Sequence, residues 1–185
     1  HPSRLLVAWA VRPVQWKLLG RTCDGILKPT ASFDLQRLAP ILLLDHGGPI
    51  MAQADVRLTT LAACYVISDY LRNGYIARPA FPIAAYALFS YLTSGNAELA
   101  RRMSATALEW CERVPDPIWG PRTELQIHAL LHPWLMQRRQ ALLPLDGMAE
   151  KMLEIGDCEY AYYVSFNRIC YKALGGEPVA ETEQC

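Results

Sequence analysis

The 185-residue sequence lacks the motifs that carry nucleotide and esterase chemistry. It has no GxxxxGK(S/T) phosphate loop and no HRD or DFG triplet, so nothing in it resembles a nucleotide-binding or kinase core. No serine stands in a GxSxG elbow, so we interpret Asp45-His46-Gly47-Gly48 as a turn rather than an oxyanion loop. The six cysteines include no CxxC pair and lie inside apolar helical patterns, which is typical of reduced thiols in a cytoplasmic protein.

An excess of one charge is also missing, because 18 Lys and Arg residues balance 18 Asp and Glu residues. The distribution is uneven: residues 1–80 hold nine basic and five acidic side chains, whereas residues 150–185 hold three and seven. No stretch approaches the clustered basic face that nucleic acid requires. We therefore expect no nucleic-acid partner.

Long apolar runs are scarce as well. The uncharged stretch from Pro79 to Ala97 has a strongly apolar part of only Ala80 to Leu92, which is too short to cross ~30 Å of hydrocarbon. The N-terminus shows no basic and then apolar signal peptide with a small-residue cleavage site. We expect no membrane span and a cytoplasmic location.

What the sequence does contain is a pair of helical patterns on either side of Ser94-Gly95-Asn96, within residues 78–107. Gly95 suits the left-handed residue that ends a helix, and Asn96 suits the cap of the next one. After the glycine, apolar residues recur at the three- and four-residue steps of a one-sided helix, at Leu99, Met103, Ala107 and Trp110. This pattern predicts a helical hairpin.

The remaining segments also carry helical patterns. Pro40 and the Gly47-Gly48-Pro49 turn are expected to disturb or stop a helix that begins at Asp34. Farther along, the bend at His132-Pro133 is expected to separate the two arms of a second hairpin. Residues 20–32 read as a connection. The predicted helices are 4–19, 34–45, 51–73, 117–131, 133–155, 158–174 and a last one within 177–185.

The first arms of the predicted hairpins begin near Arg78, Pro117 and Asp157, a step of about 40 residues that is typical of stacked helical repeats. We therefore predict an all-α fold. Residues 75–185 are expected to form stacked antiparallel helical hairpins, a TPR-like α-solenoid truncated at its C-terminus. Residues 1–74 are expected to form an irregular helical segment that packs on these repeats.

Two stretches resemble known repeat proteins. Gly95-Asn96-Ala-Glu-Leu-Ala100, followed by Ala107-Leu108, resembles the second half of a tetratricopeptide repeat, in which a turn glycine precedes alanines where two helices cross. The run Leu153-Glu-Ile-Gly-Asp157-Cys-Glu-Tyr160-Ala161-Tyr-Tyr, continuing through Asn167 to Gly175-Gly-Glu-Pro178, is similar to the repeat region of large bacterial signalling proteins.

In those signalling proteins a serine/threonine kinase domain and an AAA-type ATPase domain precede the repeats, and a GAF domain and a histidine kinase or similar output domain follow. The resemblance implies a non-catalytic protein-interaction or regulatory scaffold segment without a cofactor. Its partners would be other domains of the same parent chain or a protein or peptide. Any ATP-dependent kinase activity would belong to the parent chain.

Polar residues on the predicted first arms are candidates for a binding surface. If these arms line the concave side, His128, Asn167 and Arg168 would face a bound segment. His128 and His132 stand four residues apart on one helical face, one turn after Glu124, and form a weak candidate metal site. The alternative function is therefore a small helical metal-dependent enzyme or ligand-binding domain that uses His128 and His132. A solvated polar face explains the same residues without a ligand.

Overall fold

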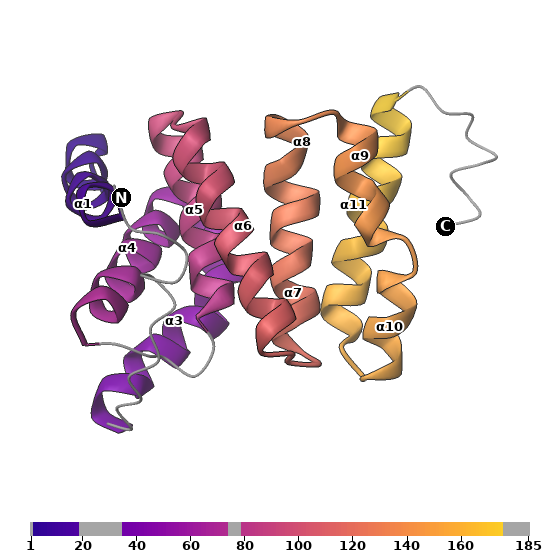
Figure 1. Ribbon diagram of the computed structural model, residues 1–185, viewed down its shortest axis with the longest axis horizontal. Coiled ribbons are helices and arrows are strands. Elements are labelled where there is room, and N and C mark those ends of the chain that lie inside the picture. Colours follow the sequence, from indigo (N-terminus) through magenta and orange to yellow (C-terminus); the bar gives the residue numbers. More distant parts are fainter. Residues whose placement is uncertain (1, 19–34, 74–78, 176–185) are drawn as a thin grey trace. The chain divides into compact units, whose positions relative to one another are not determined.

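Figure 1 shows the computed structural model, which describes residues 2–18, 35–73 and 79–175. Within these ranges the backbone forms helices and turns and no strand, which confirms the predicted all-α class. None of the described helices is long and apolar enough to cross a membrane. The chain divides into two compact units, His1–Val114 and Pro115–Cys185, which we call unit 1 and unit 2.

In unit 1 the central helix α4 contacts three others. Its elements are α1 (Arg4–Leu18), α3 (Leu35–Ala54), α4 (Val56–Asn73), α5 (Ala80–Ser94) and α6 (Ala97–Arg113). α4 contacts α1, α3 and α5, and α5 pairs with α6 (Figure 1). Arg102 of α6 donates to the carbonyl of Leu18 at the C-terminal end of α1, where a cation is favourable.

α5 and α6 form the hairpin predicted around Gly95. Gly95 has a left-handed φ of 70°, and its N–H donates to the Tyr91 carbonyl at 2.7 Å. Asn96 caps α6, because its Oδ1 accepts the N–H of Leu99 at 3.0 Å. Both helices contribute fully buried alanines of the kind that a close helix pair requires: Ala87, Ala100 and Ala107.

The prediction of a turn at Gly47-Gly48-Pro49 is wrong. α3 runs through Pro40 and through this segment to Ala54, and α4 begins two residues later. The boundary lies at Asp55, whose Oδ1 accepts the backbone N–H of Arg57 at 3.0 Å and whose carboxylate pairs with the Arg57 guanidinium at 2.8 Å. A carboxylate that caps α4, rather than the glycine pair, therefore separates the two helices.

Unit 2 begins with a continuous helical rod made of α7 (Trp119–Leu125), the π-helix η1 (Gln126–Leu131) and α8 (His132–Leu135). After it come α9 (Arg138–Leu142), the 3-10 helix η2 (Leu143–Leu145), α10 (Met148–Glu154) and the long α11 (Cys158–Gly175). α11 contacts α10 and η1, and α9 contacts η1. The arm predicted over 133–155 is not one helix. The backbone is extended at Met136, between α8 and α9, and Pro144 and the left-handed Gly147, with φ 72°, interrupt the arm again.

The first arm does not end at Pro133, contrary to the sequence prediction, but continues through α8. Proline has no N–H for the carbonyl of Ala129 four residues earlier, and its ring crowds that carbonyl in a regular α-helix. The chain widens here into the π-helix η1, in which His132 N–H donates to the Ile127 carbonyl. The Tyr171 hydroxyl of α11 donates to the Ala129 carbonyl at 2.8 Å. A neighbouring helix thus supplies the hydrogen bond that Pro133 cannot make.

A largely buried ion pair joins α7 to the start of α11. Arg122 Nε lies 2.7 Å from Asp157 Oδ2, and Arg122 Nη2 lies 3.1 Å from Asp157 Oδ1, so the pair is bidentate. The same guanidinium lies over the Tyr160 ring, 4.2 Å from its centroid. Gly156, with φ 78°, reverses the chain immediately before Asp157, where the sequence predicts that a new helix begins.

The starts of α5, α7 and α11, at Ala80, Trp119 and Cys158, are 39 residues apart in each case. The division between the compact units falls at Val114–Pro115 and not at the expected 74/75, because α5 packs against α4 within unit 1. The predicted connection over 20–32 and the predicted last helix within 177–185 lie outside the described residues.

Candidate functional site

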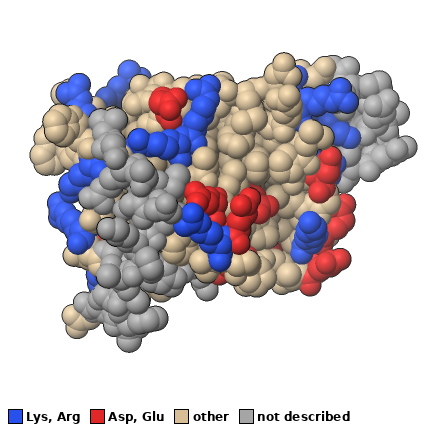
Figure 2. Space-filling model, viewed as in Figure 1, with Lys and Arg blue, Asp and Glu red and all other residues tan. Residues whose placement is uncertain are grey.

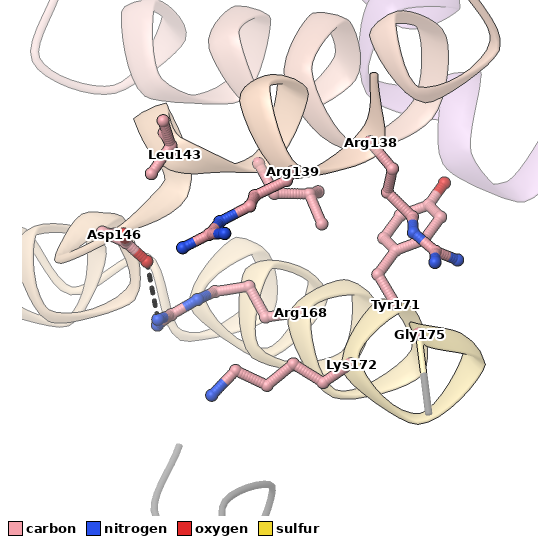
Figure 3. A pocket seen from close by; sticks show the side chains of 9 residues that line it. Arg138, Arg139, Leu143, Asp146, Arg168, Tyr171, Lys172 and Gly175 are labelled. Carbon is pink, nitrogen blue, oxygen red and sulfur yellow. Dashed lines mark hydrogen bonds and ion pairs between the residues drawn. The ribbon is translucent and has the colours of Figure 1, made fainter. Parts of the chain in front are cut away.

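A basic pocket of about 350 Å³ lies in unit 2, lined by residues of α9, η2 and α11 (Figure 3). Its charged residues are four cations, Arg138, Arg139, Arg168 and Lys172, and one carboxylate, Asp146. Leu142, Leu143 and Tyr171 add apolar surface. Figure 2 shows Lys and Arg atoms gathered in the region where α9 and α11 lie in Figure 1.

The charged side chains reach the pocket from two helices. Figure 3 shows Arg139, Arg168 and Lys172 extending toward the side where Asp146 lies, whereas Arg138 lies beside Tyr171. Arg168 Nη2 is 2.8 Å from Asp146 Oδ1. Because the Asp146 side chain is 62% exposed, this ion pair contributes little stability and exchanges readily with solvent or another anion.

The local sequence explains where these cations stand. Arg168 and Lys172 are four residues apart on α11 and therefore share a face, although two like charges at this spacing destabilise a helix by about 0.2–0.5 kcal/mol. Arg138 and Arg139 open α9. Over residues 115–185 the sequence holds ten acidic and six basic residues, and four of those six line this pocket. The concentration of positive charge is therefore local and runs against the composition of the unit.

Tyr171 connects the pocket to η1. Its hydroxyl donates to the Ala129 carbonyl, which leaves the ring as part of the pocket wall. Burial raises the pKa of Tyr171, and the positive charge of Arg138 opposes the increase. The phenol therefore stays protonated at neutral pH and remains a hydrogen-bond donor.

Of the predicted binding residues, Arg168 lines this pocket. Asn167 does not, and its Nδ2 donates to the Tyr163 carbonyl one turn earlier on the same helix at 2.8 Å. His128 lies on η1 and is half-buried. The three residues are thus not gathered in one pocket.

The two histidines of the candidate metal site contact each other edge to face, with ring centroids 5.0 Å apart. Burial, together with the nearby His132, lowers the pKa of His128 to about 4, and burial lowers the pKa of His132. His128 Nδ1 has no hydrogen-bond partner in the described part of the chain. No group of three His, Cys, Asp or Glu side chains that could hold a metal ion occurs among residues 2–18, 35–73 and 79–175, so Glu124 does not complete a site with this pair.

Among the residues that the structure describes, unit 1 has two mainly apolar hollows. One hollow is lined by Pro40, Leu43, Leu44, Gly47, Met51 and Tyr65, and another by Arg12, Pro13, Gln15, Trp16, Asn96 and Leu99. Neither lining brings together more than one charged side chain. Trp9 and Trp16 of α1 add further exposed apolar surface.

Sequence reasoning identified Arg168 but missed its three basic neighbours. The available signals were the Arg138-Arg139 pair and the spacing of Arg168 and Lys172, each of which is also common on solvated helix faces. Only the structure shows that both pairs line the same hollow.

The described residues therefore define an all-α protein with a local basic pocket. No known protein family matches the chain, and no curated protein or solved structure matches it. The functional argument accordingly depends on the geometry and charge of the pocket itself.

Proposed function

We propose that this chain is a non-catalytic protein-interaction or regulatory segment whose basic pocket receives an acidic segment of a partner. The observation that carries the proposal is the concentration of four cations around one hollow in an otherwise acidic unit. Cations held by two helices attract and orient an anionic group.

The proposal includes the setting that the sequence resemblance implies. The 39-residue spacing of Ala80, Trp119 and Cys158 supports hairpins stacked as a TPR-like α-solenoid. Such an array would connect the catalytic domains of a bacterial signalling ATPase or kinase in the cytoplasm. The free thiols of the described cysteines support a reducing compartment: Cys64, Cys111, Cys158 and Cys170. The partner would be another domain of the parent chain or a separate protein.

Titration of the whole chain with hexaglutamate, followed by ¹H–¹⁵N NMR, tests the proposal. We expect shift changes concentrated in residues 138–146 and 168–175. Arg139→Gln and Arg168→Gln should each weaken binding roughly three- to tenfold, because each removes one charge-assisted contact. Lys151→Gln is the matched control, since Lys151 is exposed on α10 and does not line the pocket. Equal weakening by Lys151→Gln, or shift changes spread over both units, would contradict the proposal.

A further inference from the structure

We propose that the basic pocket of unit 2 binds the phosphoryl group of a phosphorylated protein segment. This inference rests on the proposed function, because it names the anion that the interaction surface takes. α9 supplies Arg138 and Arg139, and α11 supplies Arg168 and Lys172. Guanidinium groups present planar donor pairs that match phosphate oxygens, and an ammonium adds a compact positive charge.

The charge of the lining fits a dianion better than a single carboxylate. Four positive charges face one negative charge in the pocket. A glutamate side chain brings one negative charge, whereas a phosphorylated side chain brings about −1.5 to −2 at pH 7 together with three acceptor oxygens. Neither Arg138 nor Arg139 forms an ion pair within the part of the chain that the structure describes, so both guanidinium groups can accept a new anionic partner.

Three of the four cationic side chains extend to the same side of the pocket, and Arg138 lies beside Tyr171 (Figure 3). In Figure 3 the side chains of Arg139, Arg168 and Lys172 extend to the side of the pocket where Asp146 lies. Asp146 contacts Arg168 through one 2.8 Å hydrogen bond and is largely exposed. A phosphoryl group carries more charge and can accept from several donors at once, so it can replace this carboxylate. Asp146 is therefore an internal competitor for the site.

The surroundings favour a protein segment over nucleic acid or an anionic membrane. Extended polyanions bind through many phosphates to a broad basic face. Outside this pocket, the described residues 115–175 contain two basic residues and six acidic ones, so the surface of this part of the unit disfavours such polymers. Leu142, Leu143 and the Tyr171 ring border the cations, and the carbon atoms of a peptide can pack against them.

Three acetylated and amidated heptapeptides that differ only in a central phosphoserine, glutamate or serine test the inference. Binding to the whole chain is measured by calorimetry and by NMR shifts at residues 138–146 and 168–175. We expect the phosphoserine peptide to bind roughly tenfold more tightly than the glutamate peptide, and the serine peptide not to bind detectably.

Variants sharpen this test. Arg139→Gln and Arg168→Gln should each weaken phosphoserine-peptide binding roughly tenfold, and Lys151→Gln should leave it unchanged. Asp146→Asn should strengthen binding several-fold, because it removes the competing carboxylate. A gain of affinity in this variant cannot arise from misfolding.

The outcomes separate this inference from the proposed function. Equal affinity for the phosphoserine and glutamate peptides would overturn the phosphoryl assignment and leave the interaction function standing. Failure of every acidic probe, hexaglutamate included, would overturn both. Tighter binding to phosphatidylinositol bisphosphate vesicles or to a single-stranded oligonucleotide than to the phosphopeptide would overturn the assignment to a protein segment. Weaker binding by Asp146→Asn would contradict the competitor role of that carboxylate.

Discussion

The two compact units use different means to hold their helices together. In unit 1 the α5–α6 hairpin depends on local caps and on buried small side chains, with Ala87, Ala100 and Ala107 excluded from solvent. Both units also have polar contacts between helices. In unit 1 Arg37 of α3 pairs with Asp69 of α4 at 2.7 Å. In unit 2 two such contacts act on one helix, because the Arg122–Asp157 ion pair and the Tyr171–Ala129 hydrogen bond both tie α11 to the first helical rod. Because hydrogen bonds depend on angle as well as distance, such contacts fix how α11 is rotated.

That rotation decides which side chains line the basic pocket. Tyr171 lies next to Arg168 on the helical wheel, on the side away from Lys172, and its hydroxyl donates to the Ala129 carbonyl of η1. Arg168 and Lys172 are thereby presented to the same hollow as the arginines of α9. Within the described residues, the basic pocket lies in the less regular unit, which has the π-helix and the interrupted second arm.

The largest effect is expected from Met103→Ala in unit 1. Met103 is 1% exposed in α6, so truncation leaves a cavity and should lower the free energy of unfolding by about 3 kcal/mol. The matched control is Met136→Ala, which changes a methionine that is 43% exposed and should cost less than about 0.5 kcal/mol. Hydrogen–deuterium exchange of peptides from each unit measures where protection is lost. An equal loss of protection in residues 158–175 would mean that the two units unfold together and do not differ in stability.

The hairpin of unit 1 could be predicted from sequence because its determinants are local. The left-handed Gly95, the capping Asn96 and the apolar period of α6 all lie within a few turns of one another. The extent of α3 could not be predicted in this way. Gly47, Gly48 and Pro49 are residues typical of a turn, but α3 continues through them. α3 packs against α4, and such tertiary contacts override local helix propensity.

The candidate site shows the same limit. Arg168 could be identified as a polar residue on a helical first arm, and it does line the pocket. The contribution of Arg138 and Arg139 could not, because it requires the short α9 and the interruption at Pro144 and Gly147 that follows it. The local sequence shows which residues are charged, but it does not show that charged residues far apart in the chain line one pocket.

A pH-dependent loss of stability is expected next in size, from the histidine pair of unit 2. The pKa of His128 is about 4 in the folded chain, against 6.5 for an unperturbed histidine. Between these values the unfolded chain binds a proton that the folded chain does not. The free energy of unfolding should therefore fall by about 1–2 kcal/mol between pH 7 and pH 5, and it should not depend on this group above pH 7 or well below pH 4.

Urea unfolding at pH 7 and pH 5, compared between the parent chain and His128→Gln, measures this dependence. The variant should lose a large part of the pH dependence of unfolding. The remaining part should have the same sign, because the pKa of His132 is also lowered in the folded chain. If His128→Gln leaves the pH profile unchanged, the ring is not held neutral by burial in unit 2.

The smallest effect on stability is expected from the Tyr171–Ala129 hydrogen bond of unit 2. Tyr171→Phe removes the hydroxyl that donates to the Ala129 carbonyl and should lower the free energy of unfolding by about 1 kcal/mol. In a Pro133→Ala background the new N–H at position 133 can serve the same carbonyl, so the loss should be smaller. A double-mutant cycle followed by urea unfolding should therefore give a coupling of about 0.5 kcal/mol or more.

Tyr163→Phe is the control for this cycle, because the Tyr163 hydroxyl donates at 3.0 Å to Glu159 on an exposed part of the same helix. Its effect should add to that of Pro133→Ala without coupling. Tyr171→Phe should also weaken hexaglutamate binding, since the hydroxyl holds the rotation of α11 and hence the positions of Arg168 and Lys172. Additive behaviour of Tyr171→Phe, with unchanged hexaglutamate binding, would mean that apolar packing alone orients α11. The polar contacts would then not explain how α11 presents its cations to the basic pocket of unit 2.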